Sequence, residues 1–241
     1  MSRYVDQHLM KKQMDPNCNC ELCELKGLFF LNLEGEQLDI VCSGKVEREY
    51  AQGDSIIKEG TMIQNFIYLK SGLVKLFRSD LGGREHIITI AKPFDYVSLL
   101  SVFSDDYYNY SVTALEDSVT CSIKMKDVKS IINNNGSLAL NLLKRMSHIA
   151  DKIILDSLDI RTKHLRGRVA YLLIYFSQHI YHSSEFDLPL SRKEMAEYVG
   201  MTTENVIRTL SEFRRDGILK IYGKTILIMN LDTLRSIAEF G

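Results

Sequence analysis

The chain has 241 residues, of which 45% are hydrophobic and 25% charged, and its formal net charge is −1. A chain of this length can bury a full hydrophobic core and has room for roughly two domains. It contains no apolar run near the roughly 18 residues of a membrane span and no charged-then-apolar leader, so we expect a cytoplasmic protein with no membrane partner. The absence of a nucleotide loop, a nucleophile elbow and a zinc-hydrolase helix motif argues against an enzyme.

Charge is unevenly distributed along the chain. From residue 160 to the end there are 12 Lys or Arg against 9 Asp or Glu, whereas the preceding part has 18 against 22. A basic balance confined to one part of a chain is typical of a nucleic-acid-binding region. The basic part opens with residues that either touch phosphate or solvate a hinge, namely Arg161, Lys163, His164, Arg166 and Arg168.

Three of the five cysteines crowd into one short stretch near the start, as Cys18, Cys20 and Cys23. Cysteines in a cytosolic protein favour metal or redox chemistry over a disulfide framework. The spacing lets three thiolates converge on one centre, but a stable cluster or a tetrahedral zinc site generally needs a fourth ligand. An iron–sulfur cluster, structural zinc and thiols without metal therefore remain alternatives, and Cys42 is expected to be a buried residue.

Residues 45–126 and 138–160 show two different patterns. The first alternates short β-like runs with regularly spaced glycines, which predicts an all-β barrel or jelly roll. The second has apolar residues at helical spacing over about 30 Å or more. Its heptad-like seam comprises Leu142, Met146, Ile149, Ile153 and Ile160, with Leu143, Ala150 and Ile154 beside it and Asp156 as a charged interruption.

Residues 191–230 carry the pattern of a winged helix-turn-helix. Gly200 ends a first helix by supplying the left-handed residue that a sharp turn needs. Thr202 caps a second helix whose buried face is apolar at steps of four and three residues. Gly223 and Lys224 then separate two β-rich runs, which predicts a hairpin, the wing. The buried positions of the two helices are Met195, Ala196, Val199, Val206, Leu210 and Phe213.

The outer face of the second helix presents candidate DNA-reading residues to the major groove. Glu204 can accept from a cytosine amino group, and Arg208 can donate a fork to guanine O6 and N7. Thr203 and Ile207 are expected to tune flanking positions, Ile207 through a thymine methyl group. Arg214, Arg215 and Lys224, further along the chain, are expected to contact phosphates, which position the helix without reading sequence. The predicted DNA-binding set is Thr202, Thr203, Glu204, Ile207, Arg208, Arg214, Arg215 and Lys224.

This arrangement resembles the cyclic-AMP receptor protein and fumarate-nitrate reductase regulator (CRP/FNR) family, whose signature pairs Glu and Arg as Glu204 and Arg208 do here. The resemblance continues through Gly-Lys-Thr of the wing and covers nearly the whole chain, although the family usually has a small residue where Ile207 stands. It implies a homodimeric transcription regulator that binds a near-palindromic double-stranded DNA site with a TGA-like core in each half-site, and that contacts RNA polymerase.

The long helix is similar to the family's dimer spine, so Leu142, Met146, Ile149 and Ile153 are expected to pack against a second copy; the alternative is a helix that only covers its own domain.

The sensor region is also similar to that family, with departures. Residues 66–77 look like the central hairpin of a cyclic-nucleotide-binding roll. No Arg or Lys lies between Lys92 and Lys124, where family members hold the phosphate, which argues against cyclic AMP. Oxygen-sensing members carry a distal cluster cysteine in a stretch similar to the one around Cys121. The resemblance thus suggests a [4Fe–4S] cluster on Cys18, Cys20, Cys23 and Cys121, with Cys18 substituting for a cysteine that the family places later.

We therefore predict an α+β protein with an N-terminal β-roll of the cyclic-nucleotide-binding-like jelly-roll type, a long dimerisation helix and a C-terminal winged helix-turn-helix. The expected boundaries are 1–134 for the sensor, 135–160 for the helix and 161–241 for the DNA-binding domain. Two alternatives stay open. One is a regulator that binds a small organic ligand in the roll, and the other is a redox or ligand module that controls a partner protein without binding DNA.

Overall fold

The computed structural model describes residues 13–14, 33 and 35–240, and it confirms the expected α+β class. Contacts divide the chain into two units, residues 1–76 with 90–147, and residues 77–89 with 148–241. Among the described residues, none of the helices has the length and apolarity needed to cross a membrane. Cys18, Cys20 and Cys23 lie outside the described residues.

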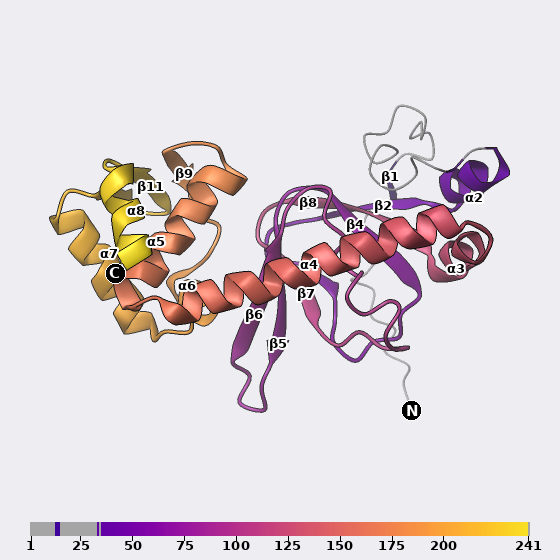
Figure 1. Cartoon of the computed structure of the whole chain (residues 1–241), viewed down its shortest axis with the longest axis horizontal. Coiled ribbons are helices and arrows are strands. Elements are labelled where there is room, and N and C mark those ends of the chain that lie inside the picture. The colour runs from indigo at the N-terminus through magenta and orange to yellow at the C-terminus, as the bar shows by residue number, and fades with distance from the viewer. Residues whose placement is uncertain (1–12, 15–32, 34, 241) are drawn as a thin grey trace, which may run out of the picture. The chain divides into compact units, whose positions relative to one another are not determined.

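Two antiparallel sheets make the β-roll (Figure 1). One sheet has the strand order β1-β2-β8-β4 and the other β3-β7-β5-β6. Buried and half-buried residues alternate along β7, as expected for a strand with one face on the core, whereas β4, β5 and β8 are buried at successive positions. The elements are β1 (Gln13–Met14), α2 (Glu36–Gly44), β2 (Val46–Tyr50), β3 (Ser55–Ile57), β4 (Asn65–Ser71), β5 (Val74–Ser79), β6 (Glu85–Ala91), β7 (Ser111–Ala114), β8 (Ser118–Lys124) and α3 (Met125–Asn134).

Two tyrosines of the roll are core residues rather than an open pocket lining. The hydroxyl of Tyr108 donates to the carbonyl of Asn65 at 2.9 Å, and that of Tyr110 donates to the carbonyl of Val97 at 3.0 Å. Burial raises the pKa of Tyr108 to about 12 and raises that of Tyr110 further. Both phenols therefore stay neutral and tie loop backbone to the roll.

The prediction of a hairpin over residues 66–77 is wrong. β4 pairs with β8 in one sheet, whereas β5 lies between β7 and β6 in the other, so the chain changes sheet between them. The corner is set by Gly72, at φ 85°, and by Leu73, whose carbonyl accepts from the backbone N–H of Leu115 at 2.7 Å. Sequence spacing predicts two strands and a turn here, but a turn residue in the left-handed region suits a corner as well as a hairpin.

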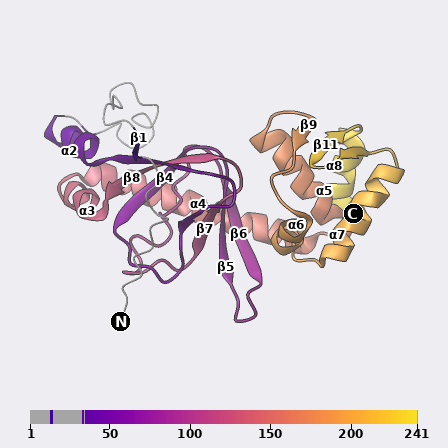
Figure 2. The same cartoon turned by 180° about the vertical axis from the view of Figure 1, so that it is seen from behind.

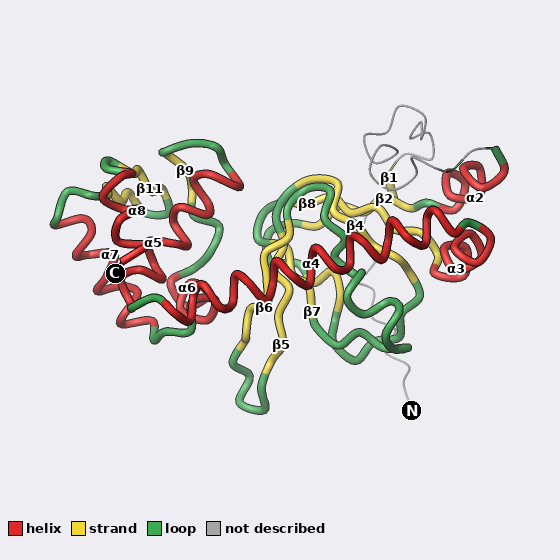
Figure 3. Tube along the Cα trace, viewed as in Figure 1, coloured by secondary structure: helices red, strands yellow, loops and turns green. Residues whose placement is uncertain are grey.

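Among the described residues, the second unit contains most of a long helix and four shorter α-helices with a small sheet (Figure 2). Figure 3 shows the helices in red and the strands in yellow, with β9 and β11 labelled. Strands β10, β11 and β9 pair in that order. Strand β9 is an addition that the sequence pattern does not indicate. The elements are α4 (Gly136–Thr162), α5 (Leu165–Tyr175), a π-helical turn η2 (Phe176–Ile180), β9 (Glu185–Asp187), α6 (Arg192–Val199), α7 (Thr203–Arg215), β10 (Leu219–Tyr222), β11 (Thr225–Ile228) and α8 (Leu231–Phe240).

Helix α4 has 27 residues and two different apolar faces. The residues of the predicted dimer seam lie toward the helix's own chain: Leu142 and Ile160 are buried in their respective units, and Met146, Ile149 and Ile153 are half-buried. A second row, about 100° further round the helix, is solvent-exposed. It comprises Leu140, Leu143, Ile154 and Leu158.

Replacing Gly72 tests the corner between the sheets. A Cβ there would lie 2.5 Å from the carbonyl oxygen of Asp117 and 2.7 Å from Cα of Ser118, in addition to the strain of a positive φ. Gly83 is the matched control, because its φ of 77° is similar and nothing lies within 4 Å of its added Cβ. We expect Gly83→Ala to cost about 1–2 kcal/mol and Gly72→Ala roughly 2 kcal/mol more, measured by urea unfolding. Equal losses would show that the corner tolerates a side chain.

Candidate nucleic-acid interface

Local capping fixes both ends of α6, and therefore where the turn to α7 begins. The hydroxyl of Ser191 accepts from the backbone N–H of Glu194 at 3.2 Å, and the carboxylate of Glu194 accepts from the backbone N–H of Ser191 at 2.8 Å, which completes a capping box. Gly200 ends α6 in the left-handed conformation, at φ 65° and ψ 46°. The helix pair is thus fixed at the residues that the sequence indicates.

Helix α7 starts at its predicted cap and buries its predicted face. The hydroxyl of Thr202 accepts from the backbone N–H of Asn205 at 3.3 Å. Val206, Leu210 and Phe213 are buried, and Thr209 is buried with them. The apolar face holds α7 against the unit, so its other face is turned to solvent.

The candidate base-reading residues share this solvent face. Glu204 and Ile207 are exposed, with Ile207 at 50%, and the side chain of Arg208 is 65% exposed. Thr203 is half-buried. The backbone N–H of Glu204 and the hydroxyl of Thr202 hold the pKa of the Glu204 carboxyl below its ordinary value. A charged acceptor at the helix start is therefore available at neutral pH.

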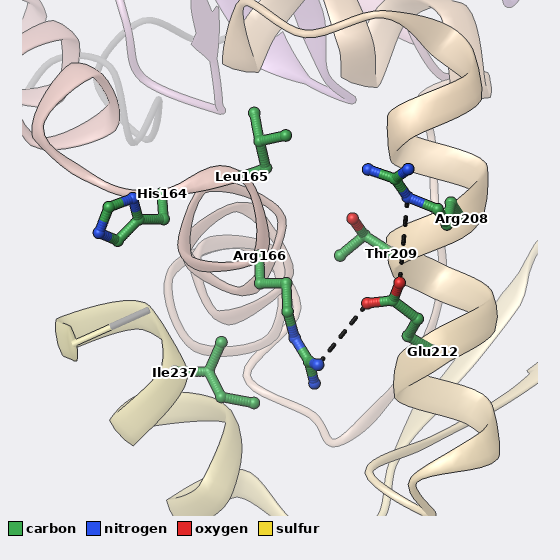
Figure 4. Close-up of a pocket in the computed structure, with 7 residues that line it drawn as sticks. All are labelled: His164, Leu165, Arg166, Arg208, Thr209, Glu212 and Ile237. Carbon is green, nitrogen blue, oxygen red and sulfur yellow. Dashed lines mark ion pairs between the residues drawn. The ribbon is translucent and has the colours of Figure 1, made fainter.

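Arg208 forms an ion pair with Glu212, one turn further along α7, rather than with Glu204. Its Nε lies 3.9 Å from Oε1 of Glu212. The other carboxylate oxygen of Glu212 lies 3.6 Å from Nη1 of Arg166, which reaches over from α5 (Figure 4). Glu212 is a residue that sequence reasoning missed, although its spacing from Arg208 is the ordinary i,i+4 signal.

The wing, defined as residues 219–228, is anchored by the strand that sequence reasoning missed. The backbone N–H of Leu188 donates to the carbonyl of Lys224 at 3.0 Å, and the hydroxyl of Thr225 donates to Asp187 at 2.6 Å. The side chain of Lys224 remains exposed at the tip. Arg214 and Arg215 are exposed at the end of α7.

One arginine of the basic segment 161–168, Arg168, has a structural role. The guanidinium of Arg168 donates to carbonyls at the end of α4, those of Lys163 at 2.9 Å and Arg161 at 3.3 Å. It also donates to the carbonyls of Val199 at 3.2 Å and Gly200 at 3.3 Å, at the end of α6. Arg168 therefore caps two helix ends and is not available to a phosphate.

Asp156 is likewise held within its own unit. Its carboxylate accepts a hydrogen bond from the hydroxyl of Tyr171 at 2.8 Å. Burial, with this bond and the nearby carboxylate charge, raises the pKa of Tyr171. The hydrogen bond gives the Asp156 charge a partner on α5, which the sequence pattern does not reveal.

In the first unit, Cys121 lies on β8, an inner strand of a four-stranded sheet. It lies on β8 opposite Glu47 of β2 and Tyr68 of β4, and its exposed fraction is 0%. Cys42, on α2, is half-buried rather than buried. In the described part of the chain, no group of three or more His, Cys, Asp or Glu side chains is arranged to hold a metal ion. Of the four cysteines predicted to hold a cluster, Cys121 alone lies among the described residues.

Comparison with known proteins gives two family matches. Residues 47–135 match the cyclic nucleotide-binding domain, and residues 167–237 match the Crp-like helix-turn-helix domain. The chain belongs to the CRP/FNR family. It is therefore a transcription regulator with these two domains and not an enzyme, in a family whose members bind DNA and form dimers.

Individual CRP/FNR proteins resemble the chain along most of its length. It is 26% identical over 231 residues to the transcriptional activator protein FnrA of Stutzerimonas stutzeri, covering 92% of this chain and 93% of that protein. It is 26% identical to the fumarate and nitrate reduction regulatory protein of Escherichia coli (strain K12), covering 97% and 96%. The structure of FixK2 from Bradyrhizobium japonicum shares the fold, with a TM-score of 0.71, 22% identity and coverage of 80% and 96%.

Proposed function

We propose that this CRP/FNR regulator reads a near-palindromic DNA site through the solvent face of α7. The observation that carries the proposal is the shared exposure of Glu204, Ile207 and Arg208 on a helix capped at Thr202 and buried on its opposite side. Such a face fits the major groove, where Glu204 can accept from cytosine and Arg208 can donate to guanine. Thr203 and Ile207 then tune flanking base pairs, in half-sites with a TGA-like core.

Phosphate contacts are assigned to exposed cations around that face. Arg214 and Arg215 extend from the end of α7, and Lys224 extends from the tip of the wing. The N-terminal amides of α7, next to Thr202, add a positive dipole end. These groups position the helix on the duplex without reading sequence.

We propose that dimerisation uses the exposed row of α4. Leu143 and Ile154 are each 57% exposed and Leu158 is 53% exposed, whereas Leu142 is buried in its own unit. A helix with an exposed apolar row is stabilised when a second copy covers it. Met146, Ile149 and Ile153, the half-buried seam, then flank the contact. A two-fold dimer implies half-sites about one DNA turn apart.

For the effector, we propose a [4Fe–4S] cluster on Cys18, Cys20, Cys23 and Cys121, in a cytoplasmic protein that acts with RNA polymerase. Support comes from the C-x-C-x2-C spacing and from the position of Cys121 within the sensor unit. When bound, the cluster supplies oxygen-sensitive redox chemistry. The residues' own part is to provide thiolates, and the buried setting of Cys121 limits its contact with water.

A second candidate effector is a small organic anion in the roll. Lys75 is a buried cation on β5, and the guanidinium of Arg145, from α4, lies 5.4 Å from the ring centre of Tyr96. Neither lies between Lys92 and Lys124, the stretch that has no Arg or Lys. A cation in the roll's own strand β5 and another on α4 favour an anionic ligand.

The DNA-binding proposal is tested by comparing Arg208→Ala with Lys224→Ala. Loss of the guanine contact should cost about 1–3 kcal/mol on the preferred site and flatten the preference for guanine. Loss of a phosphate contact should weaken all sequences alike and reduce the salt slope by about one unit. Randomised-site selection and salt titrations of binding measure both effects. Enrichment of the same motif by wild type and Arg208→Ala would contradict base reading by Arg208, and no salt-dependent binding to any DNA would favour a module that acts on a partner protein.

The dimer proposal is tested by charge placed on each face of α4. Ile154→Glu should give monomers, because two carboxylates would meet in an apolar contact. Asn141→Glu, also exposed but about 140° away round the helix, should leave the dimer intact. Sedimentation at micromolar concentration measures the outcome. If Ile149→Glu gives monomers while Ile154→Glu stays dimeric, the half-buried seam is the dimer contact.

The cluster proposal predicts brown protein after anaerobic purification that bleaches in air. Cys121→Ser should abolish the colour and the bound iron, whereas Cys42→Ser should retain both, because Cys42 is not among the proposed ligands. An absorbance scan with iron and sulfide assays provides the measurement. Colourless, iron-free wild type after anaerobic reconstitution would contradict the cluster and favour the organic ligand.

A further inference from the structure

Glu212 holds two arginines at once through separate oxygens of one carboxylate. Oε1 lies 3.9 Å from Nε of Arg208, and Oε2 lies 3.6 Å from Nη1 of Arg166. The Glu212 side chain is 27% exposed, against 65% for Arg208. Figure 4 shows Arg208 and Arg166 reaching this carboxylate from different helices. The less exposed acidic group is thus positioned to orient the more exposed arginine.

Arg166 anchors the arrangement. Its Nη2 donates to Oδ2 of Asp216 at 3.0 Å, and its guanidinium carbon lies 5.2 Å from the ring centre of Phe213, which is buried. An arginine with two carboxylate partners and an aromatic face has little rotamer freedom left. Glu212 is therefore held at one end by a fixed cation, and its remaining oxygen is directed to Arg208.

Packing does not hold Arg208 in place. It lines an open hollow of about 470 Å³ together with His164, Leu165, Thr209 and Ile237 (Figure 4). A long arginine side chain beside an open hollow has many accessible rotamers. Among the described residues, the ion pair with Glu212 is the contact that selects among them.

We propose that Glu212 is a positioning residue that sets the sequence preference of Arg208, an inference that rests on the proposed base reading by Arg208. The ion pair engages Nε, which leaves the two terminal nitrogens of the guanidinium as a fork for guanine O6 and N7. Orienting the fork before binding reduces the rotamer freedom lost when DNA docks. Arg166 and Asp216 extend the effect from the base contact to α5 and the end of α7.

The Glu212 carboxylate should favour binding to the preferred site but weaken binding to unrelated DNA. Its negative charge lies beside the surface that would face the phosphates, so it weakens attraction to any DNA. Removing the charge should therefore strengthen binding to unrelated sequences while it weakens discrimination at guanine. A residue with a purely structural role would instead lower both affinities together.

The test compares Glu212→Gln with Glu239→Gln, which removes one negative charge from an exposed position on α8, outside this network. Affinity is measured on the preferred duplex and on one with the guanine replaced in both half-sites, at one salt concentration. For Glu212→Gln we expect the ratio of the two affinities to fall about five- to tenfold and binding to the replaced duplex to become tighter. The control should keep the wild-type ratio.

Arg166→Gln provides a second variant should Glu212→Gln fold poorly, and it should lower the ratio in the same direction. If Glu212→Gln and Arg166→Gln both keep the wild-type ratio of affinities while Arg208→Ala lowers it, the proposed role of Glu212 is overturned and base reading by Arg208 stands. An unchanged ratio in Arg208→Ala itself would instead overturn the base-reading proposal on which the inference rests.

Discussion

The arrangement of the DNA-binding unit depends on the guanidinium of Arg168. Its donors satisfy carbonyls at the end of α4 and at the end of α6, where the helices leave such groups without intrahelical partners. One charged side chain therefore fixes the helix-turn-helix to the C-terminal end of the proposed dimer helix. These hydrogen bonds join the end of α4 directly to the carbonyls of Val199 and Gly200 at the turn.

The features that sequence reasoning predicts well are local ones. The cap at Thr202, the left-handed Gly200, the buried face of α7 and the wing turn at Gly223 all depend on residues within a few positions of each other. Capping chemistry and helical periodicity act over that range. The strands of the roll and the long helix were also predictable, because their patterns run over many residues.

The features that were not predictable depend on contacts between distant residues. The change of sheet at Gly72 depends on Leu115 and residues 117–118, and the role of Arg168 depends on residues 31 and 32 positions away. A heptad-like pattern on α4 likewise cannot show which of two apolar rows its own chain covers, since both rows have helical period. Periodicity identifies an apolar face, but the partner of that face is a property of the tertiary fold.

The position of Arg166 on α5 bears on how specificity evolves in this protein. A recognition helix is often regarded as a portable unit, yet here one ionic anchor of α7 belongs to another helix some 46 positions earlier in the chain. Moving residues 203–215 alone into a different scaffold would transfer the proposed base-reading face without that support. On the proposed role of Glu212, changes in site preference would also arise from substitutions in α5, outside the proposed groove-facing surface.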